Sequence, residues 1–235
     1  MSHDESLYLK TLAEFTKTLL TSYDVDTMLG ELTARLTGVL QLAGSGVSLA
    51  RDGRLAFVMG LPERVVALEE EQIARQDGPC VESYRRSEVI AVDDLAAHGE
   101  RWPHYAQVAE QVGIRAVAGI PMTLEDQRVG ALNLYSTDVR AWSPRDLSAA
   151  QVMAHMATAY LINASMYENK RRLSEQLQQA LDSRVVIEQA KGVLANEHGI
   201  GMDEAFERIR RHARSHGATV RAVSEAVVRV GLRPG

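Results

Sequence analysis

The stretch RAVAGIPMTLEDQRVGALNLYS, residues 115–136, decides the fold, because it predicts two strands joined by a tight turn. Apolar residues fill both arms, and the polar residues 125–127 form the tip between them. A hairpin of this kind cannot bury its apolar face alone, so it must belong to a larger sheet that helices cover. We therefore expect further strands and covering helices in the rest of the chain.

A second hairpin is predicted upstream, in AGSGVSLARDGRLAFVMG, residues 43–60. Its first arm alternates apolar and polar residues, and Asp52 and Gly53 form a strong turn signal. Apolar residues alternate again in the second arm, at Leu55, Phe57 and Met59. Together with EVIAVDDL, residues 88–95, the two hairpins predict five or six antiparallel strands.

Helices are predicted around these strands. Apolar residues at helical spacing predict helices at 5–20 and at 25–40, the second capped by Asp24 or Asp26. ALEEEQIARQ (67–76) is a short helix that ends at the turn-rich DGPC break, and another helix covers 105–112. A long helix opens after the second hairpin, with the cap, first and third positions taken by Ser143, Pro144 and Asp146.

The first 165 residues thus predict an α+β sandwich, in which helices flank one antiparallel sheet. The order of the elements, the GPC break (78–80) and the PMTLEDQRVGALNLY hairpin (121–135) resemble a GAF domain, of the kind found in actinobacterial regulators. The resemblance covers about residues 9–166. It implies a domain that senses a small molecule or that serves to dimerise the chain.

Charge separates this part of the chain from the rest. Residues 1–165 hold 14 Lys and Arg against 22 Asp and Glu, whereas residues 166–235 hold 12 against 9. The net charges are therefore −8 and +3, which suggests two segments with different partners. We expect a GAF sensor or dimerisation domain at 1–165, a helical connector at 166–176 and a second domain at 177–235.

The last 60 residues contain no strand signal and predict three helices, at 173–196, 203–215 and 220–230. Gly199 and Gly201 separate the first two helices, and Gly217 separates the last two. Asp203 is expected to cap the middle helix. Its apolar positions are Ala205, Phe206 and Ile209.

This tail resembles an ANTAR domain, the RNA-binding module of transcription antitermination regulators. The resemblance depends on SRVVIEQAKGVL, residues 183–194, on LQQAL before it, and on Ala205, Phe206 and Arg210 after it. It implies an all-α three-helix fold that binds paired RNA hairpin loops. The candidate RNA-binding residues are Arg184, Gln189, Lys191, Gly192, Arg210, Arg211, Arg214 and Arg221.

The chemistry of these residues agrees with RNA binding. Arg184 and Lys191 lie two helical turns apart on nearly one face, and cations bind phosphates whatever the base sequence. Gly192 costs nearly 1 kcal/mol relative to alanine inside a helix, which suggests close approach of another backbone or of a ligand. The chain departs from the family at Gly217 and Thr219, where an asparagine and a basic residue are usual. The last helix therefore offers fewer RNA contacts, and an adaptor with little RNA affinity stays an alternative.

A heptad pattern continues from the first domain toward the tail. One seam position is apolar throughout, at Ala159, Met166, Leu173, Ala180 and Ile187. The other mixes apolar and polar residues, at Met156, Asn163, Lys170, Leu177 and Arg184. An unbroken helix here would be about 75–80 Å long. Because a chain of this size cannot cover such a helix, we expect either a homodimer or a break near Tyr167–Lys170.

A sensor pocket in the first domain is expected between the sheet and residues 77–102. Its candidate lining residues are Phe57, Met59, Cys80, Trp102, Pro121 and Tyr135, which could equally be core residues. Cys80 has three interpretations: a bilin attachment site, a redox sensor or a small buried residue. We predict no cofactor, although an unknown small-molecule ligand has room here, and a haem- or bilin-bearing sensor stays a second alternative.

Other classes of function have little support in the sequence. The histidines lack metal-ligand spacing, so no metal site is predicted. No nucleophile or phosphate-binding motif occurs, so we expect no catalytic residues and no enzyme. Asp93 and Asp94 are interpreted as a turn or helix cap. With one cysteine, no signal peptide and no apolar run of about 20 residues, the chain is expected in the cytoplasm and away from membranes.

Overall fold

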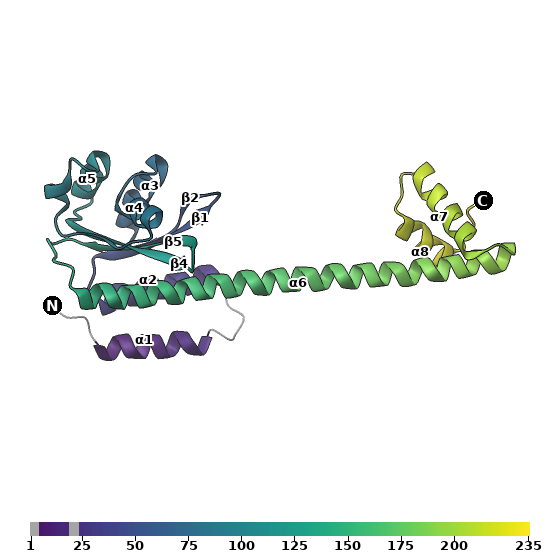
Figure 1. The fold of residues 1–235 in the computed structure, drawn as a ribbon, viewed down its shortest axis with the longest axis horizontal. Helices are drawn as coiled ribbons and strands as arrows, with labels where there is room; N and C mark the ends of the chain where they lie inside the picture. The colour runs from purple at the N-terminus through teal and green to yellow at the C-terminus, as the bar shows by residue number, and fades with distance from the viewer. Residues whose placement is uncertain (1–4, 19–23) are drawn as a thin grey trace. The chain divides into compact units, whose positions relative to one another are not determined.

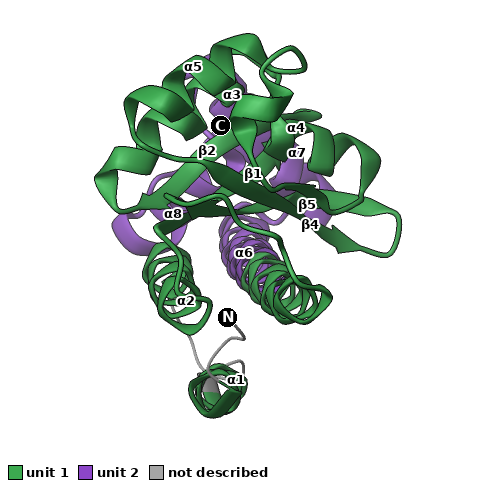
Figure 2. Ribbon diagram, turned by 90° about the vertical axis from the view of Figure 1, so that its left-hand side faces the viewer, with its two compact units in different colours: residues 1–165 green, residues 166–235 purple. Residues whose placement is uncertain are grey.

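The computed structural model describes residues 5–18 and 24–235, and the chain divides into two compact units, residues 1–165 and 166–235. Figure 2 shows the first unit in green and the second in purple. The prediction that the first helix includes Leu19 and Leu20 lies outside the described residues.

The first unit is built on one antiparallel sheet of five strands in the order β2-β1-β5-β4-β3 (Figure 1). The strands are β1 (Gly44–Arg51), β2 (Arg54–Leu61), β3 (Ile90–Val92), β4 (Ala116–Leu124) and β5 (Gln127–Ser136). Both predicted hairpins are present as β1–β2 and β4–β5. Asp52 and Gly53 join the first pair with φ angles of 51° and 77°, the left-handed conformation that a two-residue hairpin turn requires.

Helices cover both faces of the sheet (Figure 2). On one face lie α2 (Val25–Val39) and the first part of α6 (Pro144–His198), with α1 (Glu5–Thr18) beyond them. On the other face lie α3 (Val66–Arg75), α4 (Pro79–Arg86) and α5 (Pro103–Gln111). Two 3-10 turns, η1 (Glu63–Val65) and η2 (Leu95–His98), complete this second layer. The fold is therefore the α+β sandwich that the sequence predicts.

The two cores follow from the alternation of side chains along the strands. The α2–α6 face buries Val47, Ile120, Leu132 and Leu134 against helix residues that include Leu32 and Met153. The opposite face buries Val117 and Tyr135 against Leu68, Trp102 and Tyr105. Consecutive residues on β4 and on β5 thus point into different cores, and each face of the sheet packs against its own set of helices.

Local capping signals are confirmed where side-chain chemistry fixes the backbone. The Asp24 carboxylate accepts a hydrogen bond from the Thr27 amide, and the Ser143 hydroxyl accepts one from the Asp146 amide at 3.1 Å. The helix α4 was not predicted, because GPC was interpreted only as a break. Gln76 ends α3 in the left-handed conformation, and Gly78, with a φ of 138°, precedes Pro79 in the first turn of α4, so a new helix begins directly after the break.

The second unit packs the last part of α6 against α7 (Met202–Ser215) and α8 (Val220–Val230). Its core consists of Ala190, Leu194, Ala205, Ile209, Ala213, Val223 and Val227. The prediction that Asp203 caps α7 is wrong: Gly201 is the cap, and Asp203 lies in the first turn, where its charge complements the helix dipole. Phe206 is half-buried at the edge of this core and not within it.

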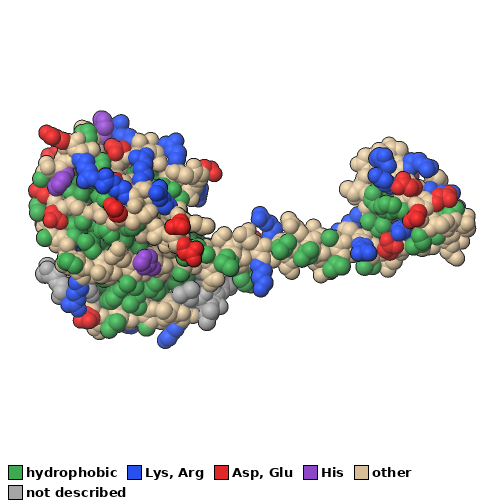
Figure 3. Space-filling view, viewed as in Figure 1, with side chains coloured by type: hydrophobic (Ala, Val, Ile, Leu, Met, Phe, Trp, Pro, Cys, Tyr) green, Lys and Arg blue, Asp and Glu red, His purple; other side chains and the backbone are tan. Residues whose placement is uncertain are grey.

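The long helix α6 runs from Pro144 to His198 without a break, so it continues through Tyr167–Lys170. Its middle part carries exposed apolar side chains, with 64% of Met166, 56% of Leu173 and 58% of Leu177 accessible. Figure 3 shows hydrophobic side chains exposed as green patches along this part of the chain. A face of this kind, uncovered over several turns, is typical of a helix that pairs with another one.

Candidate functional site

Lys191 lies where α6 meets α7. Its side chain is only 15% exposed, and its ammonium nitrogen lies 2.9 Å from Glu188 Oε1 and 5.8 Å from the centre of the Phe206 ring. The stem of the lysine is therefore packed, while its charge is held at the surface by a carboxylate and an aromatic face. Arg184, two turns earlier on the same flank of α6, is exposed.

Gly192 has no internal reason to be glycine. Within the described chain, nothing lies within 4 Å of the position that a Cβ atom would take there. The expectation that another backbone of this chain approaches Gly192 is therefore not met. The close approach of a ligand stays a prediction, and the bare helix surface beside Lys191 has room for one.

The arginines of α7 differ in their partners. Arg210 lies one turn beyond Phe206 and pairs with Glu207 at 3.1 Å, while Arg208 is 23% exposed and pairs with Glu204 at 2.7 Å. Arg211 and Arg214 are exposed and make no ion pair with any described residue. Figure 3 shows Lys and Arg side chains gathered over this part of the second unit, beside the acidic ones. Exposed ion pairs contribute only about 0.2–1 kcal/mol to stability, so RNA phosphates can replace these carboxylates at little cost in free energy.

Two further predicted residues have other surroundings. Arg221 on α8 pairs with Glu225 at 3.0 Å and donates a hydrogen bond to the Ser183 hydroxyl at 3.4 Å, which ties α8 to α6. Gln189 is exposed, but residues two apart on a helix point about 200° apart, so it lies on a different side of α6 from Lys191. Lys191 thus lies against Phe206 of α7, one turn before Arg210, whereas Gln189 lies on another side of α6 and Arg221 contacts Ser183, the neighbour of Arg184 in the chain.

The six residues predicted for a sensor pocket do not line one cavity. Cys80, Trp102 and Tyr135 are buried on the side of α3, α4 and α5. Met59 packs on the opposite face, where the Thr33 hydroxyl lies 3.8 Å from its sulfur. A β-bulge between Val47 and Ser48 is the reason, since it adds a residue to β2 and breaks strict alternation. Phe57 is half-buried on β2, and Pro121 is buried on β4.

A buried carboxyl group occupies the space beneath α3 instead. Glu69 is fully buried, and four side chains donate hydrogen bonds to it: Asn133 (2.7 and 2.8 Å), Tyr135 (2.7 Å), Gln72 (3.0 Å) and Ser48 (3.2 Å). Close by, Tyr105 Oη and Asn133 Oδ1 are buried with no hydrogen-bond partner among the described residues. We call these residues the Glu69 cluster.

Burial raises the pKa of the Glu69 carboxyl above its usual value, although its four donors act in the opposite direction. Desolvation outweighs the donors because the charge has no cation beside it. The sequence analysis missed this site. The available signals were the polar residues Ser48 and Asn133 within otherwise apolar strands, and Gly46, where a Cβ atom would lie 2.1 Å from Glu69 Oε1.

Cys80 lies beside the Glu69 cluster and is buried. Burial, reinforced by the negative charge of Glu69, holds the pKa of its thiol well above the usual range. A thiol in this state stays protonated and is a poor nucleophile. Of the three interpretations of Cys80, the structure favours the small buried residue.

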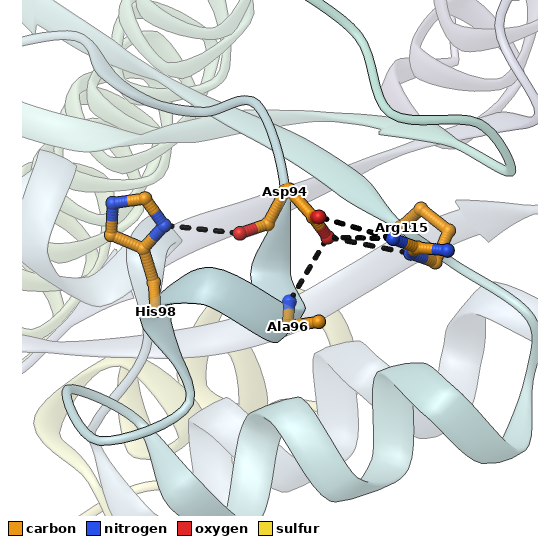
Figure 4. Close-up of polar contacts among 4 residues, drawn as sticks. All are labelled: Asp94, Ala96, His98 and Arg115. Atoms are coloured by element: carbon orange, nitrogen blue, oxygen red, sulfur yellow. Dashed lines mark hydrogen bonds and ion pairs between the residues drawn. The ribbon is translucent and has the colours of Figure 1, made fainter.

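Asp94 caps η2, as the sequence predicts for this acidic pair (Figure 4). Its carboxylate accepts hydrogen bonds from the Ala96 amide at 3.1 Å and from the Arg115 guanidinium at 3.0 and 3.1 Å. The Arg115 contact is the main cause that lowers the pKa of Asp94. An open groove of about 610 Å³ lies beside it, between η2 and α5, and none of the six predicted pocket residues lines it.

No cluster of three His, Cys, Asp or Glu side chains among the described residues could hold a metal ion. None of the described helices combines the length and the apolar content that crossing a bilayer requires.

Solved structures with a similar fold include three that are 12–16% identical to this chain. The GAF domain of a phosphoenolpyruvate-protein phosphotransferase from Coxiella burnetii has a TM-score of 0.56 and 16% identity, with 70% of this chain and 98% of that one covered. The Acinetobacter counterpart scores 0.53 at 12% identity, with coverages of 69% and 97%. The free methionine-R-sulfoxide reductase of Neisseria meningitidis scores 0.53 at 14% identity, with coverages of 71% and 96%. At these identities the likeness establishes the fold alone.

Family profiles match both parts of the chain, whereas no curated protein sequence matches it. The GAF domain profile matches residues 22–161, and the ANTAR domain profile matches residues 175–228. The first match covers the five-stranded sheet with its helices, and the second covers the packed end of α6 with α7 and most of α8. The chain therefore belongs to the GAF domain family and carries an ANTAR domain, a module of RNA-binding antitermination regulators, behind its GAF domain.

Proposed function

We propose that this protein is a non-enzymatic, cytoplasmic regulator that binds RNA and promotes transcription antitermination. Its ANTAR domain binds paired hairpin loops in nascent transcripts, and its GAF domain senses a signal or dimerises the chain. The observation that supports the proposal is the contact of α6 with α7 within the ANTAR match, where Lys191 packs over Phe206, with Arg184 two turns earlier on α6 and Arg210 one turn further along α7.

The physical basis of RNA affinity is the exchange of carboxylates for phosphates. Lys191 and Arg210 are each paired with a neighbouring glutamate on their own helix, and Arg184 and Arg214 are exposed. Binding to a phosphate chain releases condensed counterions, so affinity should fall steeply as salt rises. A hairpin loop suits this surface better than a duplex does, because its bases are splayed and accessible.

A homodimer is proposed through the exposed middle of α6. Met166, Leu173 and Leu177 follow the heptad seam and are all more than half exposed. Two chains paired there would each present one ANTAR domain, and two linked RNA contacts raise the effective concentration for the second. Holding two hairpins in this way would prevent a competing terminator hairpin from forming.

The test is a binding titration of the full-length protein with a two-hairpin RNA at several salt concentrations. We expect Lys191→Met, which keeps the packed stem over Phe206, to weaken binding and to lower the slope of log affinity against log salt by about 0.7–0.9. Arg184→Ala should act in the same direction. Arg171→Ala is the matched control, since Arg171 is an exposed cation on α6 outside the ANTAR match.

If the wild type binds the RNA and both Lys191→Met and Arg184→Ala bind it equally well, this surface is rejected. A wild type that ignores hairpin RNA even at low salt would reject the function itself. The adaptor interpretation would then gain support, because Thr219 serves as the cap of α8 and accepts a hydrogen bond from the Ala222 amide at 3.1 Å in place of offering a cation.

A further inference from the structure

We infer that the imidazoles of His212 and His216 form a stacking surface for one unpaired RNA base, an inference that rests on the proposed function. The two rings lie on α7 at a spacing of four residues. Their centroids are 4.1 Å apart, and the ring planes differ by 20°. His216 is exposed and His212 is half-buried, so the stack ends in an aromatic face that solvent reaches.

The outer ring is held in place by its own backbone. His216 Nδ1 lies 3.0 Å from the His212 carbonyl oxygen and 2.9 Å from the Ser215 hydroxyl. Both contacts are made by Nδ1, and together they fix the orientation of the ring. The other nitrogen, Nε2, makes no hydrogen bond with the described residues, and it is left as a polar atom that can meet a base edge.

The surroundings of the stack are cationic. Arg208 lies one turn before His212 on the same side of α7, and Arg211 and Arg214 continue from Arg208 around the helix, away from the imidazoles. No Asp or Glu occurs between Arg208 and Gly217. Cations at the end of a helix also offset its dipole, which accounts for arginines there. It does not account for a half-buried imidazole stacked under an exposed one, whereas an unpaired base on the outer ring, with its flanking phosphates at the arginines, would use both.

A single-stranded base is the ligand chemistry that fits this surface. Bases in RNA loops stack on aromatic side chains, histidine included, and every base has a π-face. Replacing an aromatic side chain that stacks on a base by alanine costs about 1–3 kcal/mol of binding free energy, which corresponds to a roughly 5- to 150-fold rise in Kd. An acidic protein segment would instead use the arginines and leave the ring faces unused.

The experiment measures Kd and salt slope of the full-length protein with the same two-hairpin RNA. His216→Ala should raise Kd by roughly 5- to 150-fold without changing the salt slope, because stacking releases no counterions. His216→Phe keeps a ring and should recover most of the affinity. Arg214→Ala should instead lower the slope of log affinity against log salt by about 1, as the loss of one phosphate contact does. His104→Ala, at an exposed histidine of the first unit, is the control.

Removal of single bases from the loop locates the partner. One abasic position should weaken binding to the wild type but have little further effect on His216→Ala, as expected when both changes remove one contact. The inference is overturned if His216→Ala binds like the wild type, or if it lowers the salt slope as a phosphate contact would. If Lys191→Met still weakens binding in that case, the proposed function stands without the stack. A wild type that binds no hairpin overturns both.

Discussion

Replacing Glu69 with glutamine should remove one titrating proton from the core of the GAF domain, and its effect can be worked out from the Glu69 cluster. Burial raises the pKa of Glu69 above the ordinary 4.5. At pH values between 4.5 and the raised pKa, Glu69 holds a proton in the folded chain that it has released in the unfolded chain. Stability from this group is therefore complete below pH 4.5 and is lost as pH rises through the folded pKa.

The magnitude follows from the number of protons involved. Cys80, Tyr105 and Tyr135 also face Glu69, but the pKa of each is raised well above its usual range, so all three stay protonated. Only one proton titrates in the cluster at mildly acidic and neutral pH. The free energy of unfolding of the wild type should therefore fall, relative to Glu69→Gln, by at most about 1.4 kcal/mol per pH unit.

The assay is urea unfolding, followed by tryptophan fluorescence, in steps from pH 4.5 upward. Both tryptophans of the chain, Trp102 and Trp142, are buried in the GAF domain, so the signal reports on this unit. Glu70→Gln is the matched control, since Glu70 is the next residue of α3 and is exposed. The reasoning is refuted if the difference between the wild type and Glu69→Gln is constant across pH.

Three further predictions test the ANTAR domain and the connector. Gly192→Ala should raise the stability of the second unit by up to about 1 kcal/mol, because no neighbouring atom opposes a Cβ there. The same change should weaken RNA binding if the RNA approaches that surface. Thermal melts measure the first effect, and an RNA titration measures the second. Ile209→Ala should cost about 2–5 kcal/mol of stability in the second unit, since this side chain is fully buried, and circular dichroism during urea unfolding would reveal the loss. Leu177→Asp should shift the chain from dimer to monomer in sedimentation experiments, whereas Leu124→Asp, at an exposed hairpin position, should not. An unchanged oligomeric state in Leu177→Asp would contradict pairing along α6.

Features with a short-range cause were predictable from the sequence. Asp52 and Gly53 adopt the left-handed turn that this residue pair favours between strands, and Ser143 accepts the bond from the Asp146 amide through local geometry. The helical periods of the tail likewise led to the right number of helices. The ANTAR motif located Lys191 on a surface of the second unit before any contact was known.

Tertiary packing decided the remainder. The run of three glutamates at 69–71 offers no local reason for one to be buried, and only the packing of α3 on the sheet selects Glu69. The bulge beside Val47 sends Met59 to the opposite face from Tyr135, which separated two residues expected in one pocket. Sequence periodicity fixes which side chains share a face within one element. Which partner that face meets depends on contacts between segments distant along the chain, and those exist only once the sheet and its two helical layers have assembled.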